Sequence, residues 1–219
     1  MKKPRICVSI VDSDLGAIKA IEPEVAMFEV RLDLVGPGWP ELTKFLRKPW
    51  IACNRRPEEG GKGSQDEVKR TGELLRAAEA GACFVDIELQ SRNLSEVVPL
   101  IKSKAECLIS FHDMVETPAL STLVKIVESQ IKAGADLCKI ATTAQSLEDN
   151  LTLLKLIHYF PETRIIAFAM GDPGRISRIL SPLAGGYLTY ACLSPGHESA
   201  TGQIPVKELN ELYRYLRNR

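Results

Sequence analysis

The chain has 219 residues, 45% of them hydrophobic, and its 28 Lys and Arg residues are matched by 28 Asp and Glu residues. This composition is ordinary for a globular protein, and the length suits one large α/β domain. Because the net charge is zero, we expect neither nucleic acid nor an anionic membrane as a partner. No apolar run reaches the about 20 residues of a membrane span, and the short run 6–11 does not resemble a signal peptide. We therefore expect a cytoplasmic location.

The hydrophobic pattern repeats as a strand followed by a helix, from one end of the chain to the other. Gly, Pro and polar clusters separate the units. The predicted strand and helix pairs are 5–11 with 15–21, 27–34 with 41–46, 50–54 with 65–80, 83–89 with 94–103, 106–112 with 120–133, 135–141 with 147–159, 164–170 with 175–183, and 187–193 with 206–216.

Eight such units predict a (β/α)8 TIM barrel, an α/β fold in which near-continuous apolar strands form a parallel sheet buried on both faces. We expect residues 1–219 to form a single domain, since no linker interrupts the pattern. A doubly wound open sheet is the alternative, but the even count and spacing favour closure. Short loops around Gly81 and Gly134 are expected on the lower face.

The six cysteines lie inside apolar, strand-like runs, and none forms a C-x-x-C pair. Buried thiols that act as small hydrophobic groups explain this placement better than a disulfide framework does. The same argument makes a structural zinc site improbable, and we predict no metal.

Polar residues gather where the predicted strands end. In a barrel, the carboxyl ends of the strands carry the catalytic groups, whereas residues at the other end are structural. Ionisable or polar side chains from most of the units therefore converge on one mouth: Glu29, Arg31, Asp33, Arg55, Glu59, Asp86, Glu88, His112, Asp113, Lys139, Arg178, Ser199 and Gln203.

Lys139 stands out because it interrupts a predicted buried strand. Desolvation there should disfavour the ammonium form and lower the pKa of Lys139, so that the free amine can attack a carbonyl. A lysine at a strand end whose head reaches solvent is the structural alternative. Asp86 or Glu88, which share a strand face, could give Lys139 or an arginine a buried partner.

His112 ends the strand before that of Lys139, and consecutive strands of a parallel barrel are neighbours about 4.8 Å apart. An imidazole beside an amine suits general acid/base catalysis. Glu29, Arg31 and Asp33 alternate on one predicted strand and should share a face. For Asp33, an internal ion pair is at least as good an explanation as a substrate contact.

These groups suit a lyase that forms a Schiff base. Lys139 would condense with a ketone, and the iminium would make the adjacent proton removable by His112 without a metal or another cofactor. Arginines at the mouth predict a small-molecule substrate with a carboxylate or a phosphate. Residues 194–205 have the composition of a lid or of an ordinary surface loop.

Seven motifs resemble, in order, those of type I 3-dehydroquinate dehydratase. They are Glu29-Val-Arg31-Leu-Asp33, Arg55-Arg-Pro-Glu-Glu59-Gly-Gly, Asp86-Ile-Glu88-Leu, Ser110-Phe-His112-Asp113, Lys139-Ile-Ala, Met170-Gly-Asp-Pro-Gly-Arg-Ile-Ser-Arg178 and Ser199-Ala-Thr-Gly-Gln203-Ile. The resemblance implies a cofactor-independent syn dehydration of 3-dehydroquinate to 3-dehydroshikimate, in the shikimate pathway, through an imine on Lys139. It also implies a homodimer.

The resemblance further implies roles for individual side chains. His112 would be the general acid/base, and Glu59 would support it. Substrate-binding roles, direct or by holding the binding groups in place, would fall to Glu29, Arg31, Arg55, Arg178, Ser199 and Gln203, with Arg178 holding the carboxylate. Thr201 and Met114 depart from the family pattern, which bears on the lid and on the packing under His112.

Two other functions remain open from the residues alone. A class I aldolase-type lyase acting on a sugar phosphate would share the barrel and the lysine, and the Gly171–Gly174 turn could bind phosphate. The carboxylates at the mouth would, however, repel a dianion. A non-catalytic barrel scaffold is the other alternative, because the fold alone does not fix the function.

Overall fold

The computed structural model describes residues 3–217, and its strands form one continuous parallel sheet. The strands are β1 (Ile6–Ile10), β2 (Met27–Arg31), β3 (Trp50–Cys53), β4 (Phe84–Glu88), β5 (Glu106–His112), β6 (Leu137–Thr143), β7 (Ile165–Met170), β8 (Thr189–Cys192) and β9 (Ile204–Pro205). The α-helices are α1 (Leu15–Ile21), α2 (Leu32–Val35), α3 (Trp39–Thr43), α4 (Glu67–Glu79), α5 (Leu94–Lys102), α6 (Leu120–Lys132), α7 (Glu148–Tyr159), α8 (Arg175–Leu180) and α9 (Val206–Arg217).

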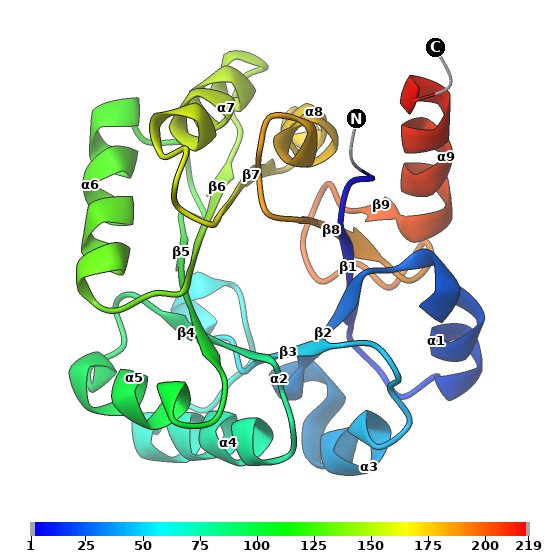
Figure 1. Cartoon of the computed structure of the whole chain (residues 1–219), viewed down its shortest axis with the longest axis vertical. Coiled ribbons are helices and arrows are strands. Elements are labelled where there is room, and N and C mark those ends of the chain that lie inside the picture. Colours follow the sequence, from blue (N-terminus) through cyan, green and yellow to red (C-terminus); the bar gives the residue numbers. More distant parts are fainter. Residues whose placement is uncertain (1–2, 218–219) are drawn as a thin grey trace.

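The strands follow each other around a ring with the helices outside it, as Figure 1 shows. β1 pairs with both β2 and β8, so the first strand of the chain lies beside the eighth. The predicted (β/α)8 barrel is confirmed. β9, a two-residue strand that was not predicted, pairs with β8 and leads into α9.

Between β7 and β8 the structure records no strand ladder among the described residues. Single backbone hydrogen bonds join this seam instead. Tyr187 N donates to Ile165 O (2.7 Å) at the lower end, and Gly171 N donates to Thr201 O (3.2 Å) at the upper end. The spacing across the seam therefore depends more on side chains than it does elsewhere in the ring.

The barrel interior changes from apolar to charged along the strands. An apolar cluster that includes Cys7, Met27, Ile51, Phe84, Leu108 and Leu137 fills its lower part. Since alternate strand residues point the same way, the residues two positions farther along, Ser9, Glu29, Cys53, Asp86, Ser110 and Lys139, also face inward. All of them are buried. The functional candidates thus sit on an apolar floor.

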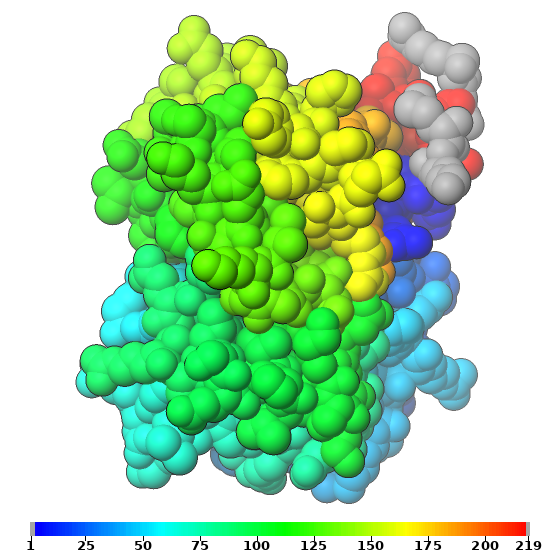
Figure 2. Space-filling view, turned by 60° about the vertical axis from the view of Figure 1, so that its left-hand side comes forward, coloured from blue at the N-terminus to red at the C-terminus, as the bar shows by residue number. Residues whose placement is uncertain are grey.

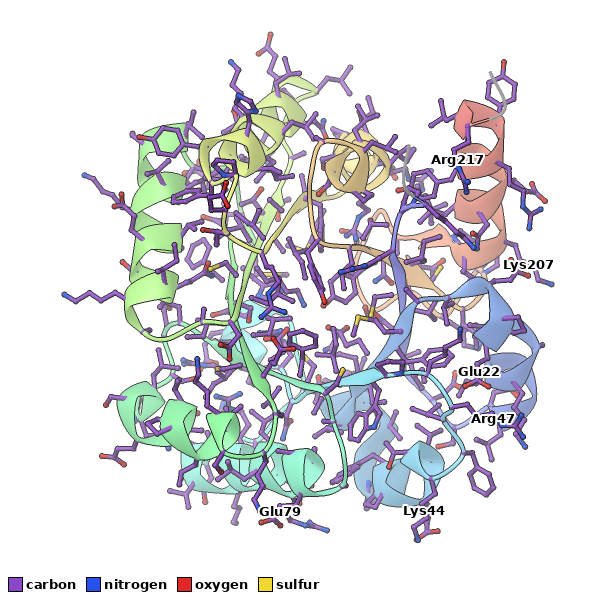
Figure 3. All side chains as sticks on the ribbon, in the orientation of Figure 1. Glu22, Lys44, Arg47, Glu79, Lys207 and Arg217 are labelled. Atoms are coloured by element: carbon purple, nitrogen blue, oxygen red, sulfur yellow. The ribbon has the colours of Figure 1, made fainter. Side chains whose placement is uncertain are left out.

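Helices cover the outside of the ring, and two further apolar clusters fill the space between strands and helices. Figure 2 shows one outer face, where α5 and α6, in green, cover the wall. The charged side chains labelled in Figure 3 lie on outer elements, among them Glu22, Lys44 and Lys207. No helix within residues 3–217 is long and apolar enough to cross a membrane.

Helix boundaries follow from local chemistry. α4 begins after Asp66, whose side chain accepts hydrogen bonds from Val68 N and Lys69 N, as an N-cap should. The short lower-face loops were predicted correctly. Gly81 and Gly134, each at φ 96°, end α4 and α6 in a conformation that favours glycine. α3 begins two residues before its predicted start, because Pro40 fits the first turn of a helix.

All six cysteines are free, as expected. Five are buried, whereas Cys83, which immediately precedes β4, is partly exposed. Its thiol donates to Trp50 O at 3.1 Å.

Candidate active site

A cavity of about 390 Å³ opens at the carboxyl ends of the strands. The structure brings all nine predicted site residues to its wall: Glu29, Arg31, Arg55, Glu59, His112, Lys139, Arg178, Ser199 and Gln203. Cys53, Met114, Phe168 and Tyr190 are among the other lining residues. The sequence therefore predicted where these side chains gather, while their individual roles stay predictions.

Lys139 lies inside the ring at the middle of β6, with 4% of its surface exposed. Its Nζ donates to Asp86 Oδ2 (2.9 Å) and to Glu29 Oε1 (3.1 Å). The face of the Tyr190 ring lies on a further side, 4.3 Å from Nζ to the centroid. The alternative of a lysine whose head reaches bulk solvent is therefore wrong.

The prediction that burial lowers the pKa of Lys139 is also wrong. Desolvation does oppose the charged form, but the carboxylates of Asp86 and Glu29 outweigh it and raise the pKa above the ordinary value of 10.5. With its pKa raised above 10.5, the side chain of Lys139 is an ammonium ion at neutral pH. It must lose a proton before it can attack a carbonyl.

Asp86 lies on β4 and joins the lysine to a buried arginine. It accepts from Arg55 Nη2 (2.6 Å) and from Ser110 Oγ (2.6 Å), in addition to Lys139. Burial alone would raise the pKa of Asp86, but Arg55 and Lys139 hold it well below its usual range. This carboxylate is a fixed negative charge in the site.

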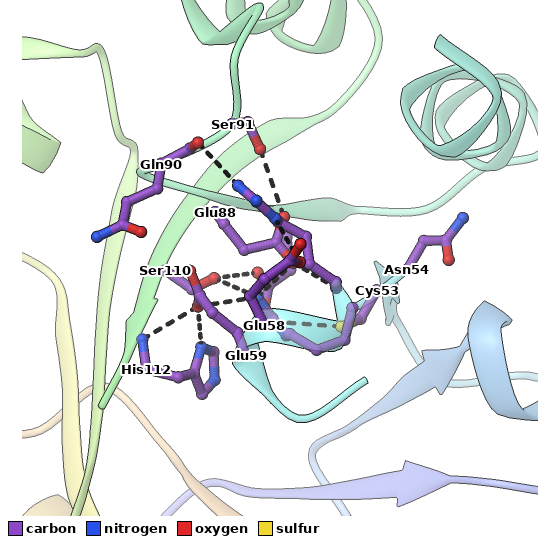
Figure 4. Close-up of polar contacts among 12 residues, drawn as sticks. Cys53, Asn54, Glu58, Glu59, Glu88, Gln90, Ser91, Ser110 and His112 are labelled. Carbon is purple, nitrogen blue, oxygen red and sulfur yellow. Dashed lines mark hydrogen bonds and ion pairs between the residues drawn. The ribbon is translucent and has the colours of Figure 1, made fainter. Parts of the chain in front are cut away.

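Glu88, two residues farther along β4, lies between two arginines. Arg55 Nη1 donates to its Oε1 (2.9 Å), and Arg70 Nη1 donates from α4 to its Oε2 (2.7 Å). Figure 4 labels Glu88 near Ser110 and Cys53 within this network of polar contacts. Buried ion pairs require such complete hydrogen bonding to offset desolvation. The network holds Arg55 rigidly at the cavity wall, and it confirms that Asp86 and Glu88 provide buried partners for Lys139 and an arginine.

His112 ends β5, and Glu59 comes from the 3₁₀ helix Pro57–Glu59 after β3. Glu59 Oε2 accepts from His112 N (3.1 Å) and contacts His112 Nδ1 at 2.7 Å, as Figure 4 shows. Burial, Arg55 and Lys139 lower the pKa of His112 well below 6.5, whereas burial raises the pKa of Glu59 to about 7. When Glu59 is ionised, a neutral ring donates from Nδ1 and keeps Nε2 as an acceptor.

The strand register places this histidine relative to the lysine. Ser110 pairs with Lys139, and His112 pairs with Ala141. His112 thus lies two residues farther toward the mouth on the neighbouring strand, facing the same way as Lys139. The site holds a neutral base above a protonated amine.

Arg178, on α8, has 1% of its surface exposed and no ion-pair partner among residues 3–217. Its Nη2 donates to Thr201 O at 3.2 Å, but Nε and Nη1 have no hydrogen-bonding partner there. Its Cζ lies 4.4 Å from the centroid of Phe168. Burial lowers the pKa of Arg178 to about 9. A buried guanidinium with free donors is suited to bind an anion.

The segment after β8 closes one side of the cavity. Gln203 Nε2 donates to Ser199 Oγ (3.0 Å), and Gln203 Oε1 accepts from Ser199 N (2.8 Å). Gln203 Nε2 also lies 3.4 Å from Ser9 Oγ, which donates to Glu29 Oε2 at 2.9 Å. A chain of hydrogen bonds therefore leads from this segment to the carboxylate beside Lys139.

Asp33 does not share a strand face with Glu29 and Arg31, so that prediction is wrong. β2 ends at Arg31, and Asp33 lies in the short helix α2. From there it accepts from Arg31 Nε (2.9 Å) and Nη2 (2.7 Å). The ion-pair alternative for Asp33 is confirmed, and the pair fixes Arg31 at the cavity edge.

The two departures from the family pattern have visible contacts. The carbonyl of Thr201 accepts from Gly171 N and Arg178 Nη2, which ties the segment after β8 to the end of β7 and to the guanidinium. Met114 lines the cavity near Gly60, where an added Cβ would lie 2.8 Å from Met114 Cε. Met114 therefore packs over the loop that carries Glu59.

Among the described residues, Glu29, Cys53 and Asp86 have ligand atoms close enough to hold a metal ion, all within 4.8 Å of one another. The chain's own cations already lie there, because Lys139 contacts both carboxylates and Arg55 contacts Asp86 and the thiol. The donor set therefore fits an internal charge network better than it fits a metal site.

Ser9, Phe168 and Tyr190 line the cavity but were missed, because attention to charged residues at strand ends excludes them. Ser9 could have been found as a hydroxyl facing inward two residues after Cys7. For Phe168 and Tyr190 the sequence offers no signal that separates them from ordinary core aromatics.

The cavity lies at the carboxyl ends of the barrel strands, and it is lined by many charged groups that form ion pairs with one another. This arrangement defines the class of protein as a (β/α)8-barrel enzyme. Comparison with known proteins identifies the family. The model of the type I 3-dehydroquinase family matches residues 6–219. The chain belongs to that family.

Individual relatives agree with this assignment. The chain is 41% identical over 214 residues to a 3-dehydroquinate dehydratase of Dehalococcoides mccartyi, covering 98% of this chain and 96% of that protein. A 3-dehydroquinate dehydratase of Methanocaldococcus jannaschii is 37% identical, covering 96% and 98%. A crystal structure of type I 3-dehydroquinate dehydratase from Clostridium difficile, with covalent modified comenic acid, has a TM-score of 0.87 at 26% identity, covering 99% of this chain and 93% of that one.

Proposed function

We propose that this chain dehydrates 3-dehydroquinate to 3-dehydroshikimate through an imine on Lys139, with His112 as general acid and base. The family assignment supports the overall reaction. The observation that carries the mechanism is the presence, in one cavity, of the Lys139 amine and of the Arg178 guanidinium, which has no carboxylate partner among residues 3–217. A substrate with both a ketone and a carboxylate would satisfy both groups.

The first stage forms the imine. After Lys139 loses a proton, its amine adds to the ketone carbon, and the carbonyl oxygen leaves as water once it has been protonated. The resulting iminium nitrogen keeps a positive charge beside Glu29 and Asp86, which both accept hydrogen bonds from Lys139 Nζ. His112, neutral because its pKa is lowered, is the base available on the neighbouring strand.

The second stage eliminates water. His112 takes a proton from the carbon next to the iminium, and the electron pair moves to the nitrogen to give an enamine. The pair then returns and expels the hydroxyl group of the next carbon, which receives the proton from His112 and leaves as water. Hydrolysis of the conjugated iminium releases the enone and restores Lys139. Glu59, 2.7 Å from Nδ1, holds the ring oriented through both transfers.

Arg178 would hold the substrate carboxylate, since two of its nitrogens lack partners. The other predicted groups differ in how much hydrogen-bonding capacity remains. Arg55 already donates to Asp86, Glu88 and Ser110, so positioning of the network suits it better than direct binding. Ser199 and Gln203 would contact substrate hydroxyls from the lid side, and Glu29 and Arg31 from the wall. The homodimer stays a prediction.

The proposal is tested by mixing the protein with 3-dehydroquinate, following the ultraviolet absorbance of the enone, and then adding borohydride. We expect an adduct whose mass maps to Lys139. Lys139→Ala should abolish both the adduct and the turnover, whereas Lys132→Ala, which changes an exposed lysine on α6, should leave both unchanged. A wild-type protein that forms enone without any adduct on Lys139 would refute the imine.

A second variant separates the roles of the two groups. His112→Ala should still form some adduct, because the amine remains, while turnover falls by about 10³-fold or more. Normal turnover in this variant would contradict the assignment of His112. A sugar phosphate that gives the adduct when 3-dehydroquinate does not would favour the aldolase alternative.

A further inference from the structure

Two aromatic side chains, Phe168 on β7 and Tyr190 on β8, line the cavity on either side of the seam. Their ring centroids are 5.7 Å apart and their planes are inclined at 58°. Both side chains are buried, with 2% of Tyr190 exposed. Such a tilted arrangement is a favourable contact between aromatic rings.

A cationic side chain lies over the face of each ring. Lys139 Nζ lies 4.3 Å from the centroid of Tyr190, and Arg178 Cζ lies 4.4 Å from the centroid of Phe168. A cation over an aromatic face is attracted by the negative charge of the π-system, most strongly where water is excluded. The four side chains therefore form a continuous row from ammonium to ring to ring to guanidinium.

This row of side chains crosses the seam between β7 and β8, where backbone hydrogen bonds constrain the spacing of the strands least. β7 and β8 share no ladder among the described residues, whereas every other neighbouring pair from β1 to β8 does. Lys139 is held from the other side by Asp86 and Glu29, whereas within residues 3–217 the Arg178 side chain donates only to the carbonyl of Thr201. The contact of Phe168 with Tyr190 is thus the direct side-chain link between the two cations.

The hydroxyl of Tyr190 does not anchor the ring. It is buried and has no hydrogen-bonding partner among residues 3–217. Because an unpaired buried hydroxyl is unfavourable, its removal should not destabilise the fold. The position of Tyr190 is set by the packing of its ring against Phe168 and the apolar cluster of the barrel floor.

We propose that Phe168 and Tyr190 are specificity-determining residues that set the separation between the imine-forming nitrogen and the carboxylate-binding guanidinium. This inference rests on the proposed function. It selects cyclic keto acids in which the carboxylate and the ketone stand in a 1,3 relation on the ring, as in 3-dehydroquinate. Positioning of this kind raises the rate of reaction of the matched substrate over a mismatched one.

The test compares two simple probes that differ only in this spacing, 3-oxocyclohexanecarboxylate and 4-oxocyclohexanecarboxylate. Each is incubated with the protein and borohydride, and the initial rate of adduct formation on Lys139 is followed by mass. The variants are Phe168→Leu and Tyr190→Leu, with Tyr190→Phe as the matched control that keeps the ring. Because the two probes are tested in separate reactions on portions of the same preparation, the ratio of the two rates does not depend on the folded fraction.

We expect the wild type and Tyr190→Phe to prefer the 3-oxo acid, and each Leu variant to lose about tenfold of that preference. The proposal is overturned if both Leu variants keep the wild-type ratio, if Tyr190→Phe loses as much as Tyr190→Leu, or if the wild type shows no preference. A folded Leu variant that forms no adduct with either acid also contradicts it, because the amine should stay reactive. If the wild type forms no adduct on Lys139 with 3-dehydroquinate, the proposed function itself fails.

Discussion

Glu59 offers a sharp test of how the site affects stability, because it is a buried carboxyl group in a position that favours its neutral form. Its side chain is 6% exposed. Its Oε2 lies 3.9 Å from Arg55 Nη1 and 2.7 Å from His112 Nδ1. Burial, together with Glu88 and Asp86, raises its pKa from 4.5 to about 7 despite Arg55. We predict that Glu59→Gln stabilises the fold at alkaline pH while it impairs catalysis.

The sign follows from proton linkage. With a pKa raised above its unfolded value, the folded state binds the proton more tightly than the unfolded state does. Stability from this group is therefore greatest below pH 4.5 and declines as the pH rises to about 7. Raising the pKa from 4.5 to about 7, at about 1.4 kcal/mol for each pH unit, makes ionised Glu59 unfavourable by about 3.5 kcal/mol above that range.

Glutamine keeps the shape and cannot ionise, so the variant should avoid this penalty. We expect its free energy of unfolding, measured by urea titration, to exceed that of the wild type by up to about 3.5 kcal/mol at pH 8.5, and the gain to vanish near pH 4.5. Turnover should fall by about tenfold or more, because the amide orients His112 less well than a carboxylate does.

Glu58→Gln is the matched control, since Glu58 is the exposed neighbour in the same 3₁₀ helix. It should show no alkaline gain and normal turnover. A Glu59→Gln protein whose stability difference from the wild type is independent of pH would refute the reasoning. A variant that is less stable than the wild type at pH 8.5 would refute it equally.

Three further variants test the binding of the carboxylate and the packing around two glycines. Arg178→Met should raise KM for 3-dehydroquinate by about 100-fold or more. It should not lower the thermal midpoint, because it removes a buried charge with unpaired donors. An unchanged KM would contradict carboxylate binding. Gly61→Ala should cost about 2–3 kcal/mol in urea titration, because the new Cβ would lie 2.0 Å from Arg55 O. Gly72→Ala in α4, with nothing within 4 Å, should stabilise the fold by about 0.5–1 kcal/mol; equal effects at the two glycines would contradict the steric argument.

The barrel could be predicted because each unit carries its own periodicity, and a parallel sheet of eight such units has few other ways to bury both faces. The inward orientation of Lys139 follows from the same alternation, since Leu137 and Ala141 also face the interior. One prediction that failed concerned the local end of a strand. β2 ends at Arg31 because the chain turns into α2, and nothing in the alternating run 27–34 indicates that turn.

The pKa of Lys139 could not be predicted because it depends on partners that are distant in sequence. Asp86 and Glu29 are 53 and 110 residues away, and their distances of 2.9 and 3.1 Å from Nζ decide whether burial or attraction dominates. A single strand indicates only the burial. The pairing of Phe168 with Tyr190 was hidden for the same reason, because it depends on how the ring of strands closes at its seam.

In the proposed mechanism, a raised pKa for Lys139 does not oppose imine formation once charge is followed through the whole reaction. An ammonium ion and a ketone give an iminium ion and water, so one positive charge stands at the same nitrogen before and after. Asp86 and Glu29 stabilise both cations, and the free amine is needed only in passing, with the neutral ring of His112 available to take its proton. The elimination step differs, because the enamine is neutral and the carboxylates favour the iminium over it. In the proposed mechanism, the two carboxylates would therefore hold the covalent intermediate in its electron-withdrawing form, and His112 would have to supply the drive for proton removal.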